Sequence, residues 1–152
     1  FGSGILEALV VHKDKTISQR LLKLVRMQTS FVVSCPFCID MNGLDYAGQS
    51  ISEEEILALR DIKPFTEVDS LNEREKTALE YVRLISQTPI VFSEQFIRKL
   101  KIAFDEREIV VLATTIAQVN YWARLIQALG IPPAGFSDGC NILAIDSYQT
   151  LK

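Results

Sequence analysis

Apolar residues recur along this chain at intervals of three and four, the spacing that places side chains on one face of an α-helix. The clearest run lies between residues 16 and 34, where Gln28 is a single polar break in the apolar stripe Leu21, Leu24, Val25, Phe31 and Val32. No stretch alternates apolar and polar residues convincingly, as a half-buried β-strand does. The pattern therefore predicts an all-α protein.

Helix starts can be located from capping boxes, in which Ser, Thr, Asn or Asp stands three residues before Glu or Gln. Such pairs begin at Thr16, Ser52, Asn72 and Asp105, and Ser93 is a further N-cap. Proline favours the first helical position, so Cys35-Pro36 predicts another helix, running to about Gly48. With weaker helices at residues 5–11 and 142–148, the expected structure is a single-domain multi-helical bundle spanning residues 1–152.

Composition and charge limit the function. The chain has 152 residues, nearly half of them hydrophobic, with a net charge of -3. Nucleic acid and anionic membranes both require a basic face, so neither is an expected partner. The most apolar stretch, residues 109–117, is too short to span a bilayer. No secretory signal is apparent, and we expect a cytoplasmic protein.

The Cys35-Pro36-Phe37-Cys38 motif is the chemically distinctive feature. The reactive form of cysteine is the thiolate, which a helix N-terminus stabilises. Residues three apart in a helix share a face, so the two sulfurs can alternate between dithiol and disulfide. This spacing favours redox chemistry.

Two other interpretations of the cysteines are open. Both can be buried structural thiols, or they can join Cys140 and His12 in a zinc site, although that spacing fits no common zinc module. If no zinc is bound, we expect His12 to be a surface residue and Cys140 to be a thiol without a role. No phosphate-binding glycine loop or dinucleotide motif occurs. We therefore expect no cofactor, and electrons must come from an external dithiol donor.

Four segments carry a family resemblance: SCPFCIDMN at residues 34–42, SEEE at 52–55, NYWAR at 120–124 and LGIPP at 129–133. Together they resemble the carboxymuconolactone decarboxylase / alkylhydroperoxidase D-like family, over about residues 16–136. The resemblance implies an all-helical fold that forms homo-oligomers. Its redox-active members reduce peroxides or pass electrons to a partner peroxidase, whereas the related decarboxylases lack the cysteine pair as a redox centre.

Retention of Cys35 and Cys38 favours the redox branch. The resemblance thus predicts an antioxidant thiol-dependent peroxidase or disulfide oxidoreductase acting on a small peroxide or disulfide. Alternatives are a decarboxylase-branch enzyme and a non-catalytic helical assembly. The long apolar helix within residues 109–129 is expected near an oligomer interface, because one core rarely hides that much apolar surface.

Two positions depart from the family pattern. Asn42 stands where the pattern has a histidine, and Lys23 where it has a glutamate. Asn cannot act as a base at neutral pH and Lys is normally protonated, so the usual proton relay is missing. Asn42 can still hydrogen-bond a Cys38 thiolate, so Cys38 is the preferred attacking sulfur and Cys35 the resolving one. The helix N-terminus acts most strongly on Cys35 and favours the opposite assignment, which stays open. Lys23 is a possible supporting cation, although a solvated helix lysine is the more ordinary interpretation.

Three further residues complete the predictions. Asp40 is expected to be a surface carboxylate, because a negative charge beside the cysteines would raise the pKa of a thiol. Tyr121 and Trp122 are expected in the core or at an interface.

Overall fold

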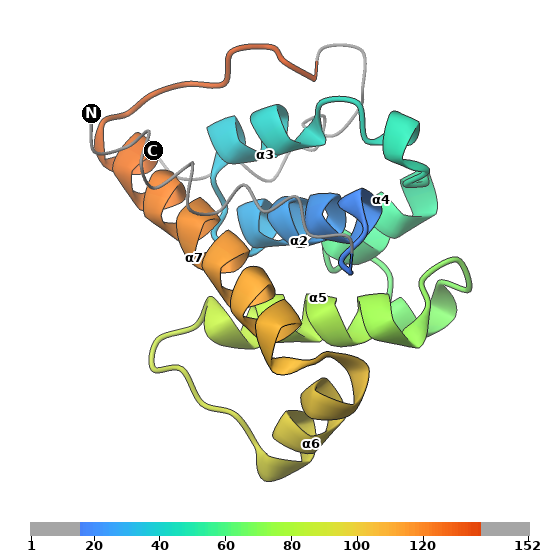
Figure 1. Cartoon of the computed structure of the whole chain (residues 1–152). Coiled ribbons are helices and arrows are strands. Elements are labelled where there is room, and N and C mark those ends of the chain that lie inside the picture. The colour runs from blue at the N-terminus through green and yellow to red at the C-terminus, as the bar shows by residue number, and fades with distance from the viewer. Residues whose placement is uncertain (1–15, 138–152) are drawn as a thin grey trace.

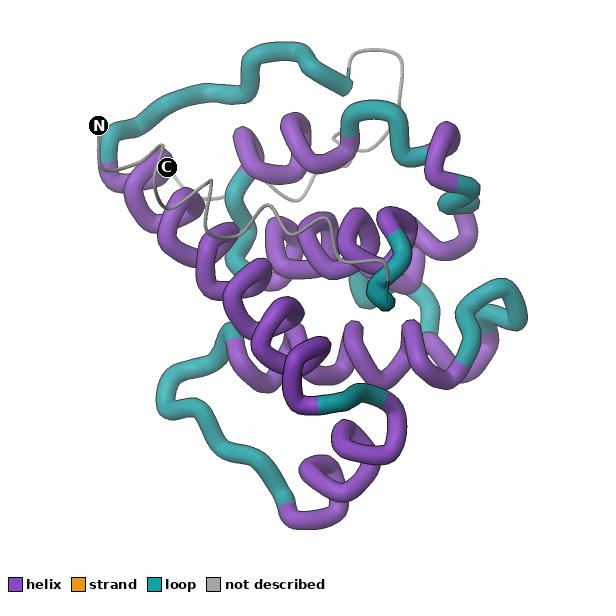
Figure 2. The backbone as a smooth tube through the Cα atoms, viewed as in Figure 1, coloured by secondary structure: helices purple, strands orange, loops and turns teal. Residues whose placement is uncertain are grey.

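The structure, a computed structural model, describes residues 16–137, and this part of the chain is built from helices and loops without a strand (Figure 2). The predicted all-α class is confirmed. The helices are α2 (Gln19–Val32), α3 (Pro36–Gly43), α4 (Glu53–Leu59), α5 (Glu73–Ile85), α6 (Glu94–Ala103) and α7 (Glu106–Ala128), with short 3₁₀ turns η1 (Ala47–Gln49) and η2 (Phe65–Glu67). The helices predicted at 5–11 and 142–148, together with His12 and Cys140, lie outside the described residues.

Most predicted helix starts are confirmed. Reciprocal capping boxes begin α4 at Ser52, α5 at Asn72 and α7 at Asp105. The Thr16 start is wrong, because the Ser18 side chain accepts the hydrogen bond from the Leu21 amide and α2 begins at Gln19. Ser18 lies directly before the first helical residue, where a short hydroxyl reaches the free amides best.

The helix predicted to run from Cys35 to about Gly48 is shorter than expected. Helix α3 ends at Gly43, and Asp45 has a positive φ of 54°, which breaks the helical path. The separate turn η1 follows. Asp is among the few residues that tolerate this left-handed conformation, so the break is consistent with the local sequence.

Helix α2 runs through the middle of the bundle, with α3 and α5 on opposite sides of it (Figure 1). Helix α7 crosses these three obliquely, and α6 packs against α5. Two apolar clusters share α2: Leu21, Leu22 and Val25 face one cluster, whereas Leu24 and Met27 belong to the other. The central helix therefore buries two sides, which fixes α3 firmly against the core.

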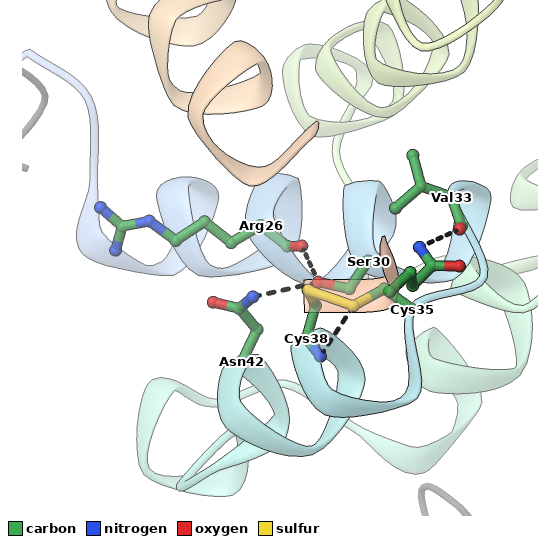
Figure 3. The surroundings of a disulfide bond; sticks show 7 residues. Arg26, Ser30, Val33, Cys35, Cys38 and Asn42 are labelled. Carbon is green, nitrogen blue, oxygen red and sulfur yellow. Dashed lines mark hydrogen bonds between the residues drawn. A yellow bond between two sulfur atoms is a disulfide. The ribbon is translucent and has the colours of Figure 1, made fainter. Parts of the chain in front are cut away.

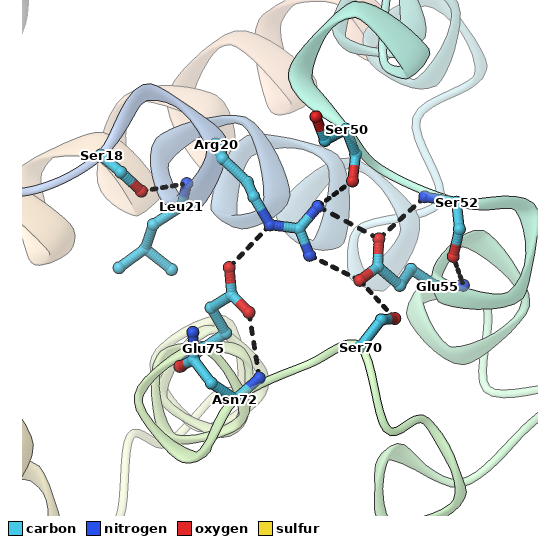
Figure 4. A network of polar contacts seen from close by, with 9 residues as sticks. All are labelled: Ser18, Arg20, Leu21, Ser50, Ser52, Glu55, Ser70, Asn72 and Glu75. Atoms are coloured by element: carbon cyan, nitrogen blue, oxygen red, sulfur yellow. Dashed lines mark hydrogen bonds and ion pairs between the residues drawn. The ribbon is translucent and has the colours of Figure 1, made fainter.

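A polar network joins the starts of three helices (Figure 4). The Arg20 guanidinium on α2 donates to Glu75 Oε1 at 2.9 Å and to Glu55 Oε1 at 2.5 Å, and it also reaches the Ser50 carbonyl. Glu55 and Glu75 are the reciprocal members of the α4 and α5 capping boxes, and both are buried. Ser70 adds a bond to Glu55 at 2.7 Å. One cation thus holds two buried carboxylates and aligns α4 and α5 with α2.

Helix α7 is long and apolar enough, by length and composition alone, to cross a membrane, and it is the one such helix in residues 16–137. It packs against α2, α3 and α5. Its outer side nevertheless carries an apolar stripe, in which Val110, Tyr121, Leu125 and Leu129 are 58%, 48%, 37% and 64% exposed. The helix therefore buries one side in the core and leaves another open.

Candidate active site

The cysteine pair lies at the turn between α2 and α3. Helix α2 ends at Val32, and Ser34 takes a positive φ of 49°, which redirects the chain. The Cys35 amide then donates to the Ser30 carbonyl at 3.2 Å, and Pro36 starts α3. The sequence prediction that Cys35 caps a helix is confirmed.

Cys35 and Cys38 form a disulfide, with their Cα atoms 5.2 Å apart (Figure 3). The Cys38 amide donates to Cys35 Sγ at 3.2 Å, so the first sulfur is the N-cap acceptor of α3. Both cysteines are buried, and they pack against Ala123 and Ile126 of α7. An amide donor and the positive end of a helix both stabilise negative charge, and here both act on Cys35.

A cavity of about 310 Å³ lies beside the second sulfur. The described residues that line it come from α2, α3 and α7, and they are Arg26, Cys38, Met41, Asn42, Gln118, Val119 and Trp122. Cys35 is not among them. A small molecule entering this cavity therefore meets Cys38 first.

Asn42 lines the same cavity as Cys38. Its Nδ2 donates to Ser30 Oγ at 3.0 Å, and that hydroxyl donates to the Arg26 carbonyl at 2.8 Å (Figure 3). Ser30 is fully buried, so this short chain fixes the Asn42 side chain. The amide nitrogen carries a second N–H, which is available to orient a substrate or a thiolate but cannot remove a proton.

Lys23 belongs to α2, and its side chain reaches the C-terminal end of α3, opposite the end that carries the cysteines. Its ammonium donates to the carbonyl of Leu44, the C-cap of α3, at 2.5 Å, and it does not line the cavity. A cation at a helix C-terminus stabilises the helix dipole. Burial lowers the pKa of Lys23, Arg26 lowers it further and Asp45 opposes them. The structure thus gives Lys23 a bond to the end of α3, with no contact to either sulfur.

The prediction that Asp40 is a surface carboxylate is wrong, because its side chain is fully buried. It accepts hydrogen bonds from the backbone amides of Ala134, Gly135, Phe136 and Ser137 at 2.8–3.1 Å, and from the Ser137 hydroxyl at 2.7 Å. Burial would raise its pKa, but the hydrogen bonds from this segment outweigh that effect and lower the pKa to about 2.

The Asp40 carboxylate ties the chain after α7 to the helix that carries the cysteines. After Gly130, at φ 62°, the backbone leaves α7 and returns toward α3 (Figure 1). The ring of Phe136 meets that of Phe37 edge-on, with centroids 6.0 Å apart. Because Phe37 lies between the two cysteines, this segment covers one side of the motif.

Sequence reasoning missed several cavity residues, above all Arg26 and Gln118. Arg26 is one of three cations in α2, with Arg20 and Lys23, so nothing in the pattern distinguished it. Trp122, expected in the core or at an interface, is partly buried against the cluster that contains both cysteines, and it also lines the cavity beside Cys38. The signal for Trp122 was present, since the NYWAR segment was one of the four that carried the family resemblance.

The zinc alternative requires ligands beyond the pair. Within residues 16–137 no group of three or more His, Cys, Asp or Glu side chains is arranged to hold a metal ion. The other two proposed ligands, His12 and Cys140, lie outside this range.

Taken together, the fold and site define an all-helical protein with a Cys-x-x-Cys disulfide at a helix start, next to a small cavity. No model of a known protein family matches the chain. Two uncharacterised bacterial proteins are similar in sequence. YdfG of Bacillus subtilis is 29% identical over 78% of this chain and 79% of its own. YnjA of Escherichia coli is 28% identical over 74% of this chain and 60% of its own.

Solved structures place the fold more firmly. An Agrobacterium tumefaciens protein of unknown function, suggested to be the antioxidant defence protein AhpD, superposes with a TM-score of 0.74 at 21% identity, over 87% of this chain and 88% of its own. The debrominase Bmp8 superposes with a TM-score of 0.74 at 19% identity, over 90% of this chain and 72% of its own.

A third solved structure, an uncharacterised peroxidase-related protein of Silicibacter sp. TM1040, superposes with a TM-score of 0.73 at 15% identity, over 90% of this chain and 71% of its own. The chain therefore has the alkylhydroperoxidase D-like fold. The resemblance found in the sequence is confirmed at the level of the fold.

Proposed function

We propose that this protein is a thiol-dependent peroxidase or disulfide oxidoreductase that cycles Cys35 and Cys38 between dithiol and disulfide. The observation that carries the proposal is the unequal setting of the two sulfurs. Cys38 lines the cavity, whereas Cys35 is the helix cap and accepts the Cys38 amide. One sulfur is placed to meet a substrate, and the other is placed to hold negative charge.

In the oxidative half-reaction, the Cys38 thiolate attacks the terminal oxygen of a hydroperoxide. The O–O bond breaks, the alcohol leaves with a proton from water, and Cys38 becomes a sulfenic acid. The Cys35 thiolate then attacks the Cys38 sulfur and displaces hydroxide, which takes a proton from the solvent and leaves as water, and the two sulfurs form the disulfide. The peroxide has gained the two electrons that the dithiol lost.

In the reductive half-reaction, an external dithiol donor attacks Cys38, the sulfur on the cavity. Cys35 leaves as a thiolate, and leaving is faster for a thiol of lower pKa. The helix cap and the Cys38 amide supply that stabilisation. The donor's second thiol then closes the donor disulfide and frees Cys38.

Single cysteine variants test the roles of the sulfurs. Both are made in a Cys140→Ser background, so that the third thiol cannot react. We expect Cys35→Ser to accumulate a sulfenic acid with peroxide, because its resolving thiol is gone, and Cys38→Ser to react no faster than free cysteine. Mass spectrometry after dimedone trapping detects the adduct.

The opposite result, with a sulfenic acid in Cys38→Ser alone, would exchange the two roles. If neither variant nor the Cys140→Ser parent reacts with peroxide faster than free cysteine, the peroxidase proposal fails. A non-catalytic helical assembly then becomes the better description.

We further propose that the protein self-associates through α7. The exposed residues Val110, Tyr121, Leu125 and Leu129 lie along one side of this helix. Tyr121, Leu125 and Leu129 follow one another at intervals of four residues at the end of this helix, and exposed apolar residues grouped in this way can mark a protein interface. A second copy presenting the same stripe would cover it symmetrically.

A further inference from the structure

We propose that Gln118 is a further catalytic residue of the peroxidase reaction, and that its side-chain amide donates a hydrogen bond to the oxygen that leaves when the peroxide is cleaved. This inference rests on the proposed function, since it assigns a role in the same reaction at the same site. It also names the substrates that need the residue most, which are hydroperoxides that release a strongly basic alkoxide.

Gln118 lies on α7, is partly buried and lines the cavity beside Cys38. Within residues 16–137, no group forms a hydrogen bond with its side-chain amide. Asn120, two residues further along the same helix, instead bonds the Ser86 hydroxyl and the Ile116 carbonyl. A polar side chain that reaches a cavity without an internal partner is available to a molecule inside that cavity.

The cleavage of a peroxide creates a need for such a donor. When the Cys38 thiolate attacks the terminal oxygen, the O–O bond breaks and the inner oxygen departs with the electron pair as an alkoxide, which then takes a proton from water. The described residues that line the cavity include no carboxylic acid or histidine that could protonate this oxygen. A fixed N–H donor aimed at a developing oxyanion stabilises the transition state instead.

The direction of attack places the leaving oxygen. Displacement at oxygen is in line, so the leaving oxygen lies beyond the attacked oxygen, on the side that faces away from the sulfur. Asn42 belongs to the same helix as Cys38, and Ser30 holds its amide one turn beyond the sulfur, where it can orient the thiolate. The Arg26 side chain extends away from both sulfurs (Figure 3). Helix α7 contributes a different wall of the cavity, and Gln118 is the carboxamide on that wall.

Trp122 is the other hydrogen-bond donor that α7 contributes to the cavity. Its ring packs against the cluster that contains both cysteines and meets the Tyr121 ring edge-on, with centroids 5.3 Å apart. The indole therefore has one N–H on a packed ring, whereas the Gln118 amide has two N–H groups at the end of a flexible side chain. A Trp122→Phe variant separates the two donors.

Two peroxides of similar size but different leaving groups test the assignment. Ethyl hydroperoxide releases an alkoxide, whereas peracetic acid releases acetate, a weak base that needs little stabilisation. With either peroxide, Cys38 takes the terminal oxygen as a sulfenic acid, and Cys35 then closes the disulfide. Stopped-flow kinetics of the reduced Cys140→Ser protein gives both rates. Dithiodipyridine, a neutral aromatic disulfide, reports the reactivity of the thiolate without a leaving oxygen.

We expect Gln118→Met to lower the rate with ethyl hydroperoxide at least about tenfold, as loss of a hydrogen bond to a charged group does. The rates with peracetic acid and with dithiodipyridine should stay nearly unchanged, because methionine is of similar size and the thiolate is not altered. Gln95→Met is the matched control, since Gln95 is exposed on α6 and does not line the cavity. Trp122→Phe should not lower the ethyl hydroperoxide rate relative to the peracetic acid rate.

Equal losses with all three reagents would overturn the assignment, because the residue would then act on the thiol or on the fold. An unchanged ethyl hydroperoxide rate in Gln118→Met would overturn it as well, as would a selective loss in Trp122→Phe alone. So would a parent that reduces peracetic acid only, since no alkoxide is then stabilised. If the parent reduces neither peroxide faster than free cysteine, the peroxidase function and this assignment fail together, and reaction with dithiodipyridine leaves disulfide exchange as the activity of the pair.

Discussion

Replacing Asp40 with Asn should release the segment that follows α7 from the helix that carries the cysteines. The carboxylate is fully buried and accepts the backbone amides of residues 134–137 together with the Ser137 hydroxyl. In Asn one of the two acceptor oxygens becomes an NH₂ group, which faces these N–H donors as a further donor. The segment then loses hydrogen bonds and gains a repulsive contact.

The magnitude follows from the acidity of the carboxyl. Its pKa is about 2, against an ordinary value of 3.8, and a difference of that size corresponds to about 2 kcal/mol in favour of the charged form in the folded protein. Because the folded pKa is lowered, this contribution is complete above pH 3.8 and is lost as the pH falls through about 2. The Asn variant lacks it at every pH.

Hydrogen exchange can locate this loss. We expect the amides of residues 134–137 to exchange roughly thirtyfold faster in Asp40→Asn, the factor that corresponds to about 2 kcal/mol. Protection in α2 and α5 should change less, since local opening of one segment need not unfold the core. Asp69→Asn, a change at an exposed carboxylate, is the control. Unchanged exchange at residues 134–137 would refute the view that Asp40 holds this segment.

Three further outcomes are expected. Asn42→His should speed peroxide-dependent loss of the Cys38 thiol at least about tenfold, because it supplies a base. This acceleration should be lost below about pH 6.5, where the imidazole is protonated. Stopped-flow kinetics measures the rate. Arg20→Met should lower the free energy of unfolding by about 3 kcal/mol, measured by thermal unfolding, because it leaves two buried carboxylates without their cation. Sedimentation should show an oligomer that Leu125→Glu shifts toward monomer, whereas a monomeric parent at micromolar concentration would contradict self-association through α7.

The Arg20 effect also has a pH dependence that follows from Glu55. Burial would raise the pKa of this carboxyl, but the bonds from Arg20, Ser52 and Ser70 lower it below the ordinary value of 4.5. The stabilisation is therefore complete above pH 4.5 and is lost as the carboxylate protonates in more acidic solution. The difference in the free energy of unfolding between the parent and Arg20→Met should therefore become smaller as the pH falls below 4.5.

Much of the fold could be predicted from the sequence because its signals are local. A capping box involves four consecutive residues, and those at Ser52, Asn72 and Asp105 form as expected. The misplaced start at Thr16 shows the limit of this reasoning. The side chain that caps α2 belongs to Ser18, two residues further along the chain, which the capping-box pattern did not single out.

The site was less predictable because its remaining residues depend on contacts between distant segments. Cys35 and Cys38, at the start of one helix, were found from their spacing, and Asn42 on the same helix was found from the family resemblance. Asp40 lies among them, yet its partners are more than 90 residues away, so nothing local could reveal its burial. Arg26 likewise becomes a site residue only because α2, α3 and α7 meet at the cavity.

The departure at Asn42 and the position of Cys35 act on different halves of the proposed cycle. Peroxide attack needs a Cys38 thiolate, and the residue one turn beyond it cannot accept a proton. Reduction of the disulfide needs a good leaving group, and the helix cap provides one at Cys35. A base at residue 42 would therefore accelerate the oxidative half, whereas the cap already serves the reductive half. Since the base is missing and the cap is present, we expect the chain to exchange disulfides more readily than it reduces peroxides.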